Sequence, residues 1–557
     1  MTNKAEAGGA ADNIGGLDTD VLPWVESAVG NELLGYILDC TPESLSSLMS
    51  GDLELSQKQA EVVQAFGAFK ASVSSNLGDD STQQAVRVWA TQTDDEGKTI
   101  ARNLRTHVRG EDDIPAGRDG LERALTLLAL DSYPVFLLPP EELDFPLPMM
   151  EKVSFRVASF ILRHPQAKVF TEAAMQDATF KRIFTESNEH AGYTTFVLRN
   201  TGSGGGLQLS LIADMILRAA WRRAQHGVTS PGSFVEEALR QLGIVRDALA
   251  GKPQTVVAKI GLAGVLLPVG AQLELDGALV RPVTETEREM APASLKGALN
   301  STDGSGNTAT INYDGDLVLE YSYPYKVRTH KGEWDGAGSW PEDMLPPESL
   351  ENTVMRLRFS LLMAVRRDFR AQLAPTWRTF DEPLSQGVSM SWSDPRQNTS
   401  LFATQLSDTE LTAWGEWYKR LSAQHFKRVE LALSRTLRAA AERRDPSDVL
   451  IDAVIAWENL FGTKDGEPTF RITMCLARLI ESSPADRLEL KRELGKIYTL
   501  RSNVVHGSAA LKASDYPRCQ KALEVAIEAI RILATERVDI LALPTGADRS
   551  AALLLEG

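Results

Sequence analysis

The spacing of apolar residues changes along this chain, and that change limits its fold more than any other feature. Between residues 21 and 130, segments such as "QKQAEVVQAFGAFKASV" repeat apolar residues every three or four positions, as helices do. From Thr255 to about Tyr325 the pattern shortens to runs such as "DLVLEYSYPYKV", separated by Asp-Gly pairs typical of hairpins. Helical spacing returns from Thr409 onward. The sequence therefore predicts a multidomain α+β fold.

The expected domain boundaries follow from the length of the chain and from its Pro-, Gly- and Ser-rich interruptions. At 557 residues the chain is too long for a single core. In chain order we expect a disordered tail over 1–20, a helical region over 21–130, a mixed α/β segment over 131–250, a β-rich domain over 251–345, a connecting helix and linker over 346–408, a helical bundle over 409–540 and a weakly ordered tail over 541–557.

Cysteine content and charge limit the classes of function. Cys40, Cys475 and Cys519 are widely spaced and form no C-x-x-C pair, which fits a reducing cytoplasm. The first residues lack a signal-peptide pattern and no apolar stretch could span a bilayer, so we expect a cytoplasmic protein with no membrane partner. A net charge of −16 argues against coating nucleic acid with the whole surface. Between His425 and Arg537, however, the chain has nineteen Lys and Arg but only sixteen Asp and Glu, so a local nucleic-acid site is possible there.

An arginine and a histidine lie five residues apart in "YTLRSNVVHGS", residues 498–508. Arg501 falls on the apolar face of a predicted helix, whose other members are Leu494, Ile497, Tyr498, Val504 and Val505. An unpaired buried charge costs several kcal/mol, so Arg501 needs a partner or a cleft. In "DVLIDAVIAWENLF", Glu458 is in register with the apolar stripe of Ile451, Val454, Ile455 and Phe461. We therefore expect Arg501 and Glu458 to pair.

The histidine occupies the expected end of the same helix. Gly507 resembles a glycine C-cap, which places His506 in the last turn. Ser502 and Asn503 lie four and three residues before His506 and can orient its ring or a ligand. Five residues turn a helix about 140° from the starting direction, so Arg501 and His506 face different ways. A joint site then needs the reach of the arginine, a distorted helix end or a second protomer.

Three segments in this part of the chain, "SDVLIDAVIAWENLFG", "FRITMCLARLI" and "LGKIYTLRSNVVHGS", resemble the ApeA-like branch of the HEPN superfamily over about Thr409 to Val538. The resemblance implies a helical bundle whose R-x(4 to 6)-H motif cuts RNA without metal or cofactor, usually as a two-fold homodimer. Arg501 and His506 match that motif, whereas Ser502 stands where many members carry Asn, Asp or His. The resemblance further implies a defence or toxin-like effector, with the preceding domains either sensing a phage-derived or cellular trigger or restraining the activity.

The residue types suggest a role for each member of the candidate site. His506 would act as general acid or base and Arg501 would stabilise the phosphate. Ser502 and Asn503 would orient these groups, and Glu458 would hold the arginine. The alternatives are a catalytically inactive HEPN scaffold and an RNA- or nucleotide-binding module, with Arg501 and Glu458 as a structural pair. No metal site is expected.

Weaker patterns elsewhere favour structural roles. The R-x4-H spacing also occurs at Arg102 and His107, which we interpret as a solvated basic cluster, and at Arg420 and His425. The Gly-rich "GSGGGL" at 202–207 lacks the lysine of a phosphate-binding P-loop, so a flexible loop is expected.

Overall fold

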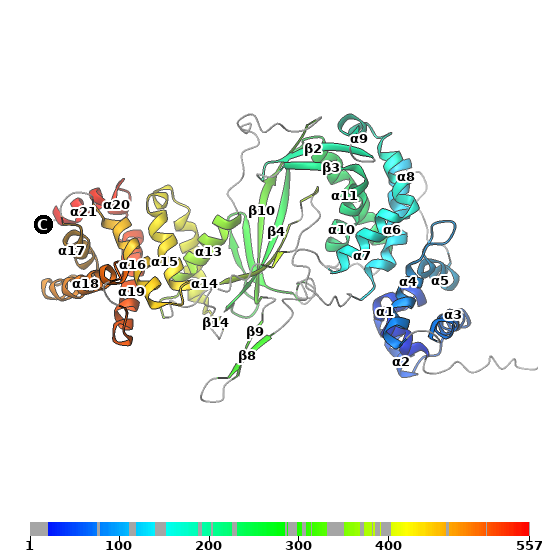
Figure 1. Cartoon of the computed structure of the whole chain (residues 1–557), viewed down its shortest axis with the longest axis horizontal. Coiled ribbons are helices and arrows are strands. Elements are labelled where there is room, and N and C mark those ends of the chain that lie inside the picture. The colour runs from blue at the N-terminus through cyan, green and yellow to red at the C-terminus, as the bar shows by residue number, and fades with distance from the viewer. Residues whose placement is uncertain are drawn as a thin grey trace, which may run out of the picture. The chain divides into compact units, whose positions relative to one another are not determined.

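The computed structural model divides the chain into two compact units, each built from several stretches of sequence (Figure 1). Unit 1 comprises 1–254, 325–345 and 381–388, and unit 2 comprises 255–324, 346–380 and 389–557. The structure describes residues 21–555 with gaps at 75–77, 111–118, 140–151, 188–191, 202–203, 225–230, 285–286, 288–297, 303–307, 313–314, 331–349, 368–372, 381, 385–389, 392–402, 464–466 and 508–509. The predicted tail over 1–20 lies outside the described residues.

Unit 1 is mainly helical. Its helices are α1 (Val21–Leu38), α2 (Pro42–Ser50), α3 (Gln57–Ser74), α4 (Asp79–Thr91), α5 (Ile100–Arg109), α6 (Gly120–Phe136), α7 (Lys152–Arg163), α8 (Pro165–Ala174), α9 (Ala178–Ile183), α10 (Ile212–Ala224) and α11 (Pro231–Leu249). Aromatic side chains join α6, α10 and α11: the Phe136 and Trp221 rings are 4.8 Å apart, and Phe234 packs against both Tyr133 and Phe136. These rings bury large apolar areas and so form the core of this unit.

A small antiparallel sheet completes unit 1. In this sheet β2 (Tyr193–Arg199) pairs with β1 (Thr185–Glu186), β3 (Gly204–Gln208) and β11 (Val327–His330). Strand β3 includes most of the Gly-rich segment, so the prediction of a flexible loop over 202–207 is wrong for residues 204–207, whereas 202–203 lie outside the described residues. Ladder hydrogen bonds to β2 supply the order that the glycine side chains cannot.

Unit 2 contains a larger sheet with the strand order β13-β12-β4-β10-β7-β6, in which β4 and β10 are labelled in Figure 1. Its strands are β4 (Gln254–Ala263), β6 (Leu273–Leu275), β7 (Ala278–Pro282), β10 (Leu317–Tyr325), β12 (Ala374–Phe380) and β13 (Met390–Ser391). The Asp276-Gly277 pair joins β6 to β7, with Gly277 at φ 72°, as the hairpin pattern predicted. Gly261 in β4 leaves room for Trp377, because a Cβ there would lie 2.2 Å from the indole nitrogen.

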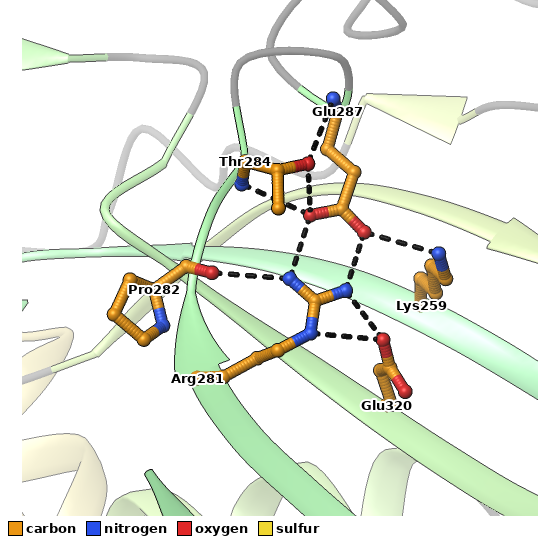
Figure 2. Close-up of polar contacts among 6 residues, drawn as sticks. All are labelled: Lys259, Arg281, Pro282, Thr284, Glu287 and Glu320. Atoms are coloured by element: carbon orange, nitrogen blue, oxygen red, sulfur yellow. Dashed lines mark hydrogen bonds and ion pairs between the residues drawn. The ribbon is translucent and has the colours of Figure 1, made fainter. Parts of the chain in front are cut away.

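A group of charged side chains binds Glu287, which follows β7 in the chain, to this sheet (Figure 2). Glu287 is 1% exposed and accepts hydrogen bonds from both terminal nitrogens of Arg281, at 2.8 and 2.6 Å, and from Lys259 at 3.0 Å. The guanidinium of Arg281 also pairs with Glu320 on β10, and Thr284 donates its amide and hydroxyl to Glu287. Burial opposes the charge on Glu287, but these donors outweigh it and hold its pKa at about 2.

The predicted connecting helix and linker over 346–408 contributes strands as well as a helix. Helix α13 (Leu350–Ala364) is followed by β12, which lies inside the large sheet between β4 and β13. Further along, β14 (Thr404–Gln405) pairs in parallel with β5 (Val265–Leu266). A two-stranded hairpin of β8 (Ala298–Thr302) and β9 (Thr308–Asn312) completes the strands described in unit 2.

Helices occupy the C-terminal part of unit 2, so the described chain is α+β as predicted. They are α14 (Asp408–Leu421), α15 (Glu430–Ala441), α16 (Pro446–Phe461), α17 (Pro468–Ile480), α18 (Pro484–Val505), α19 (Tyr516–Thr535), α20 (Val538–Leu541) and α21 (Gly546–Leu555). Trp457 of α16 is fully buried and donates to the Ala522 carbonyl of α19 at 3.2 Å. Trp414 and Cys475 are also fully buried, so these three side chains pack the core.

The segment expected to be a weakly ordered tail, 541–557, instead contains α21. Arg549, Ser550 and Leu553 of this helix are 1%, 0% and 3% exposed. The sulfur of Cys475 on α17 lies 3.4 Å from the Ser550 hydroxyl. Small residues on α21 let it pack closely against the bundle, and this packing explains why the prediction from local sequence was wrong.

Candidate functional site

Helix α18 carries the arginine of the candidate site. The helix starts at Pro484 behind the N-cap Ser483, whose hydroxyl accepts the Asp486 amide. Leu494 and Ile497 are fully buried, as the apolar stripe predicted. The stripe was predicted to continue to Val505, but that residue is 47% exposed. The last turn of α18 therefore lies at the surface of the bundle.

Arg501 and Glu458 meet, as their register with the apolar stripes predicted. An Arg501 terminal nitrogen lies 3.5 Å from a Glu458 carboxylate oxygen, and the two side chains are 21% and 30% exposed. Tyr498, one turn before Arg501, donates its hydroxyl to the other Glu458 oxygen at 2.6 Å. Burial, and then the neighbouring Glu458, raise the pKa of Tyr498 to about 12, so the phenol stays protonated and donating.

The guanidinium of Arg501 retains hydrogen-bonding capacity after this pairing. Its Nε is buried and has no hydrogen-bond partner among the residues that the structure describes. Because Nε is buried while the side chain as a whole is 21% exposed, an incoming oxyanion would have to bind the terminal nitrogens of Arg501.

The histidine lies at the C-terminal end of the same helix. His506 is the C-cap of α18, and its amide donates to the Ser502 carbonyl at 3.0 Å. Gly507 follows at φ 68°, the left-handed conformation expected of a glycine that ends a helix. His506 is exposed, whereas Ser502 and Asn503 are half-buried. Within the described residues no side-chain hydrogen bond joins Ser502 or Asn503 to His506, so the expected orienting contact is not formed.

Helix α16 positions Glu458. The end of this helix is held by Arg549, a residue that the sequence pattern did not indicate. Arg549 of α21 donates to the carbonyls of Asn459, Leu460 and Leu543 at 2.8, 2.7 and 3.0 Å. Asn459 and Leu460 belong to the last turn of α16, whose carbonyls have no partner within the helix. A buried arginine from the C-terminal helix thus caps the turn that carries Glu458. Its position in the sequence gave no signal, because the segment was expected to be a tail.

Tyr498 is a second residue of the site that the sequence pattern did not indicate. The pattern predicts only that it lies on the apolar stripe of α18, but its hydroxyl binds the Glu458 carboxylate, which pairs with Arg501. The available signal was its position three residues before Arg501, which puts a phenol and a guanidinium on the same face of the helix. A phenol on a stripe that already contains a charge needs a polar partner, and Glu458 provides it.

The arginines of the two other R-x4-H pairs make contacts within the protein. Arg102 is 2% exposed and forms an ion pair of 3.0 Å with the buried Asp131, so the expected solvated cluster is wrong for this residue. His107 lies at the surface, 2.6 Å from Glu61. Arg420 donates to the Ala534 carbonyl at 2.8 Å, and the side chain of His425 lies outside the described residues.

Comparisons with known proteins identify no relative: no family model, curated protein or solved structure matches the chain. Among the described residues no group of three or more His, Cys, Asp or Glu side chains is arranged to hold a metal ion. In the same part of the chain, every helix is too short or too polar to cross a membrane.

Proposed function

We propose that this protein is a metal-independent endoribonuclease of HEPN type whose site includes Arg501 and His506. His506 of one copy removes the proton of the ribose 2′-OH, whose oxygen attacks the adjacent phosphorus, and a protonated His506 of the second copy serves as the acid. The bond to the 5′-oxygen breaks and that oxygen takes a proton from the acid. The products carry a 2′,3′-cyclic phosphate and a 5′-hydroxyl. His506 exchanges protons, and Arg501 stabilises the charge on phosphorus.

The observation that carries the proposal is the arrangement around Arg501. Glu458, which accepts the Tyr498 hydroxyl, pairs with the guanidinium at the half-buried rim of the bundle, where the Arg501 side chain is 21% exposed. An exposed histidine ends the same helix. Preorganised donors of this kind stabilise a developing charge at little cost in reorganisation.

The proposal includes a homodimer formed through the C-terminal helices. Arg501 and His506 lie on different sides of α18, so one copy presents the arginine and the histidine in different directions. A two-fold interface would bring two helix ends together and complete an acid and base pair. Cleavage by a strictly monomeric protein would contradict this part of the proposal.

The first test is RNA cleavage by the full chain in EDTA. His506→Ala and Arg501→Ala are each expected to lower the cleavage rate by about 100-fold or more, because general acid–base and oxyanion groups contribute on that scale. Arg501→Lys is expected to be damaging as well, since the planar fork is lost. Cleavage products are separated on gels, and their ends are identified by mass spectrometry.

Matched controls are His107→Ala, which removes a surface histidine with the same spacing to an arginine, and Arg492→Ala, which removes an exposed arginine from the same helix. Both are expected to leave the rate unchanged. If the protein binds RNA without cutting it, and the His506→Ala variant still binds, the RNA-binding module is favoured instead. If the protein neither binds nor cuts RNA, the scaffold is favoured, in which Arg501 and Glu458 are a structural pair.

A further inference from the structure

A pocket of about 460 Å³ lies in unit 1, far along the sequence from the candidate nuclease site. Its walls are the C-terminal ends of α9 and α11 and strand β11 with the residue before it, and Arg182, Gly251, Lys326, Arg328 and His330 are among the lining residues. This volume is within the range of small-molecule sites.

The pocket is lined by cations because of the alternation of strand β11. Successive side chains of a strand point to opposite faces, so Arg328 and His330 of β11 share one face with Lys326, which directly precedes the strand; Val327, which also lines the pocket, is buried. Arg182, from the last turn of α9, lines the same pocket. No acidic residue lines the described pocket, which carries three permanent positive charges in a chain of net charge −16.

Two of these cations have their guanidinium groups available. Arg182 and Arg328 are exposed, and neither has an ion-pair or hydrogen-bond partner for its side chain among the described residues. The backbone of Lys326 is held in place by the buried Asn200, which accepts its amide at 2.8 Å and donates its own amide to the Lys326 carbonyl at 3.0 Å. Strand β11 therefore presents its cations from a fixed backbone.

The helix ends oppose this charge only weakly. A helix C-terminus carries roughly half a negative charge, and its effect falls off within a turn. At the end of α11, the amides of Ala250, Gly251 and Lys252 already cap the carbonyls of Arg246, Ala248 and Asp247. Three full positive charges outweigh these partial charges, so the pocket favours an anion.

We propose that this pocket binds a ligand carrying two or more phosphate groups, of the size of a nucleoside di- or triphosphate. The guanidinium groups of Arg182 and Arg328 would each take phosphate oxygens in a bidentate manner, and Lys326 would add a third positive charge. The apolar atoms of Ile183 and Leu249 line the same pocket and would pack against a nucleobase. This proposal is independent of the nuclease assignment, because the pocket lies within unit 1 and Arg501 within unit 2.

The test is isothermal titration of the full chain with ATP, inorganic pyrophosphate and adenosine, in low salt without divalent ions. ATP is expected to bind one site per chain, and Arg182→Gln and Arg328→Gln are each expected to weaken binding by about tenfold, the effect of losing one charge-assisted contact. The control Lys168→Gln removes a cation that is 85% exposed on α8 of the same unit, and should leave the affinity unchanged.

The three ligands distinguish binding of the phosphate groups from binding of the nucleoside. Pyrophosphate binding as tightly as ATP would support a polyphosphate site without base recognition, and tighter binding of ATP would support a nucleotide site. Binding of adenosine alone, no binding of either phosphate ligand, or ATP binding that both arginine variants leave intact would overturn the proposal. Circular dichroism of the variants checks that these exposed substitutions keep the fold.

Discussion

The variant Glu287→Gln is expected to destabilise the large sheet of unit 2 by about 3 kcal/mol, because it removes the negative partner of a buried ion pair. Glu287 is 1% exposed and accepts from Arg281, Lys259 and Thr284 (Figure 2). The glutamine amide would keep the shape of the carboxylate, but its NH2 group would face the N–H donors that now bind Glu287. Glu320 alone would then neutralise the charge of Arg281. We place the loss at the lower end of the range for breaking such pairs because Glu320 remains.

Hydrogen–deuterium exchange of the full chain measures this effect locally, which suits a protein of two units. Peptides from β7 and β10 should exchange faster in the variant. Glu351→Gln is the matched control, because Glu351 is 54% exposed and pairs with Arg378 of the same sheet at 2.9 Å. An exposed pair contributes less than about 1 kcal/mol, so exchange should hardly change. Equal effects of the two substitutions would refute the assignment.

The same carboxylate is expected to make the sheet sensitive to acid. The pKa of Glu287 is about 2 in the folded protein, below its ordinary value of 4.5. A depressed pKa stabilises the folded state above the ordinary value, and this contribution is lost as the pH falls from 4.5 toward 2. Exchange in β7 and β10 should therefore accelerate over this interval in the wild-type protein. In Glu287→Gln the acceleration should be smaller, and an identical pH profile would contradict the assignment.

The second large effect is expected from Arg549→Met, which should destabilise the C-terminal helices by about 3 kcal/mol. The guanidinium is 1% exposed and donates to three backbone carbonyls, of Asn459, Leu460 and Leu543. Burial lowers the pKa of Arg549 to about 10, so the charge is costly to bury and these hydrogen bonds offset that cost. Methionine fills the space but leaves three buried acceptors without a donor, each costing about 1–3 kcal/mol before water enters.

Hydrogen–deuterium exchange also measures this effect, and in Arg549→Met the amides in the last turn of α16 and in α21 should exchange faster. Arg549→Lys should also accelerate exchange, because a single ammonium cannot reach carbonyls that a planar fork spans. Arg492→Met, at an exposed position of α18, is the control and should have little effect. If Arg549→Met left α16 protected, Arg549 would not be what holds the turn bearing Glu458.

Sequence reasoning succeeded where the decisive interactions follow from local spacing. The meeting of Arg501 and Glu458 could be predicted because each charge interrupts an apolar stripe, and a charge on such a stripe requires a partner. The Asp276-Gly277 hairpin follows from the φ preferences of two adjacent residues. The glycine that ends α18 follows from the same kind of preference.

Sequence reasoning failed where residues distant in the chain decide the structure. Arg102 is buried because Asp131, twenty-nine residues away, neutralises it, and no local pattern announces this pairing. The Gly-rich segment forms β3 because β2 offers a hydrogen-bonding edge. Helix α21 becomes ordered because Arg549 finds carbonyls about ninety residues earlier in the chain. Each is a tertiary contact that overrides a local preference.

The interleaving of the two units has a consequence for how such a protein can be inherited. The chain passes from one unit to the other five times, after residues 254, 324, 345, 380 and 388. At one passage, Lys326 alone separates β10, in the sheet of unit 2, from β11, in the sheet of unit 1. A crossover between two related genes after residue 254 would give the first unit a β11 from the other parent, and one after residue 324 would give the large sheet a β12 from the other parent. A single crossover at either point thus mixes parental segments within one sheet, and we expect the two units to be inherited together as one block.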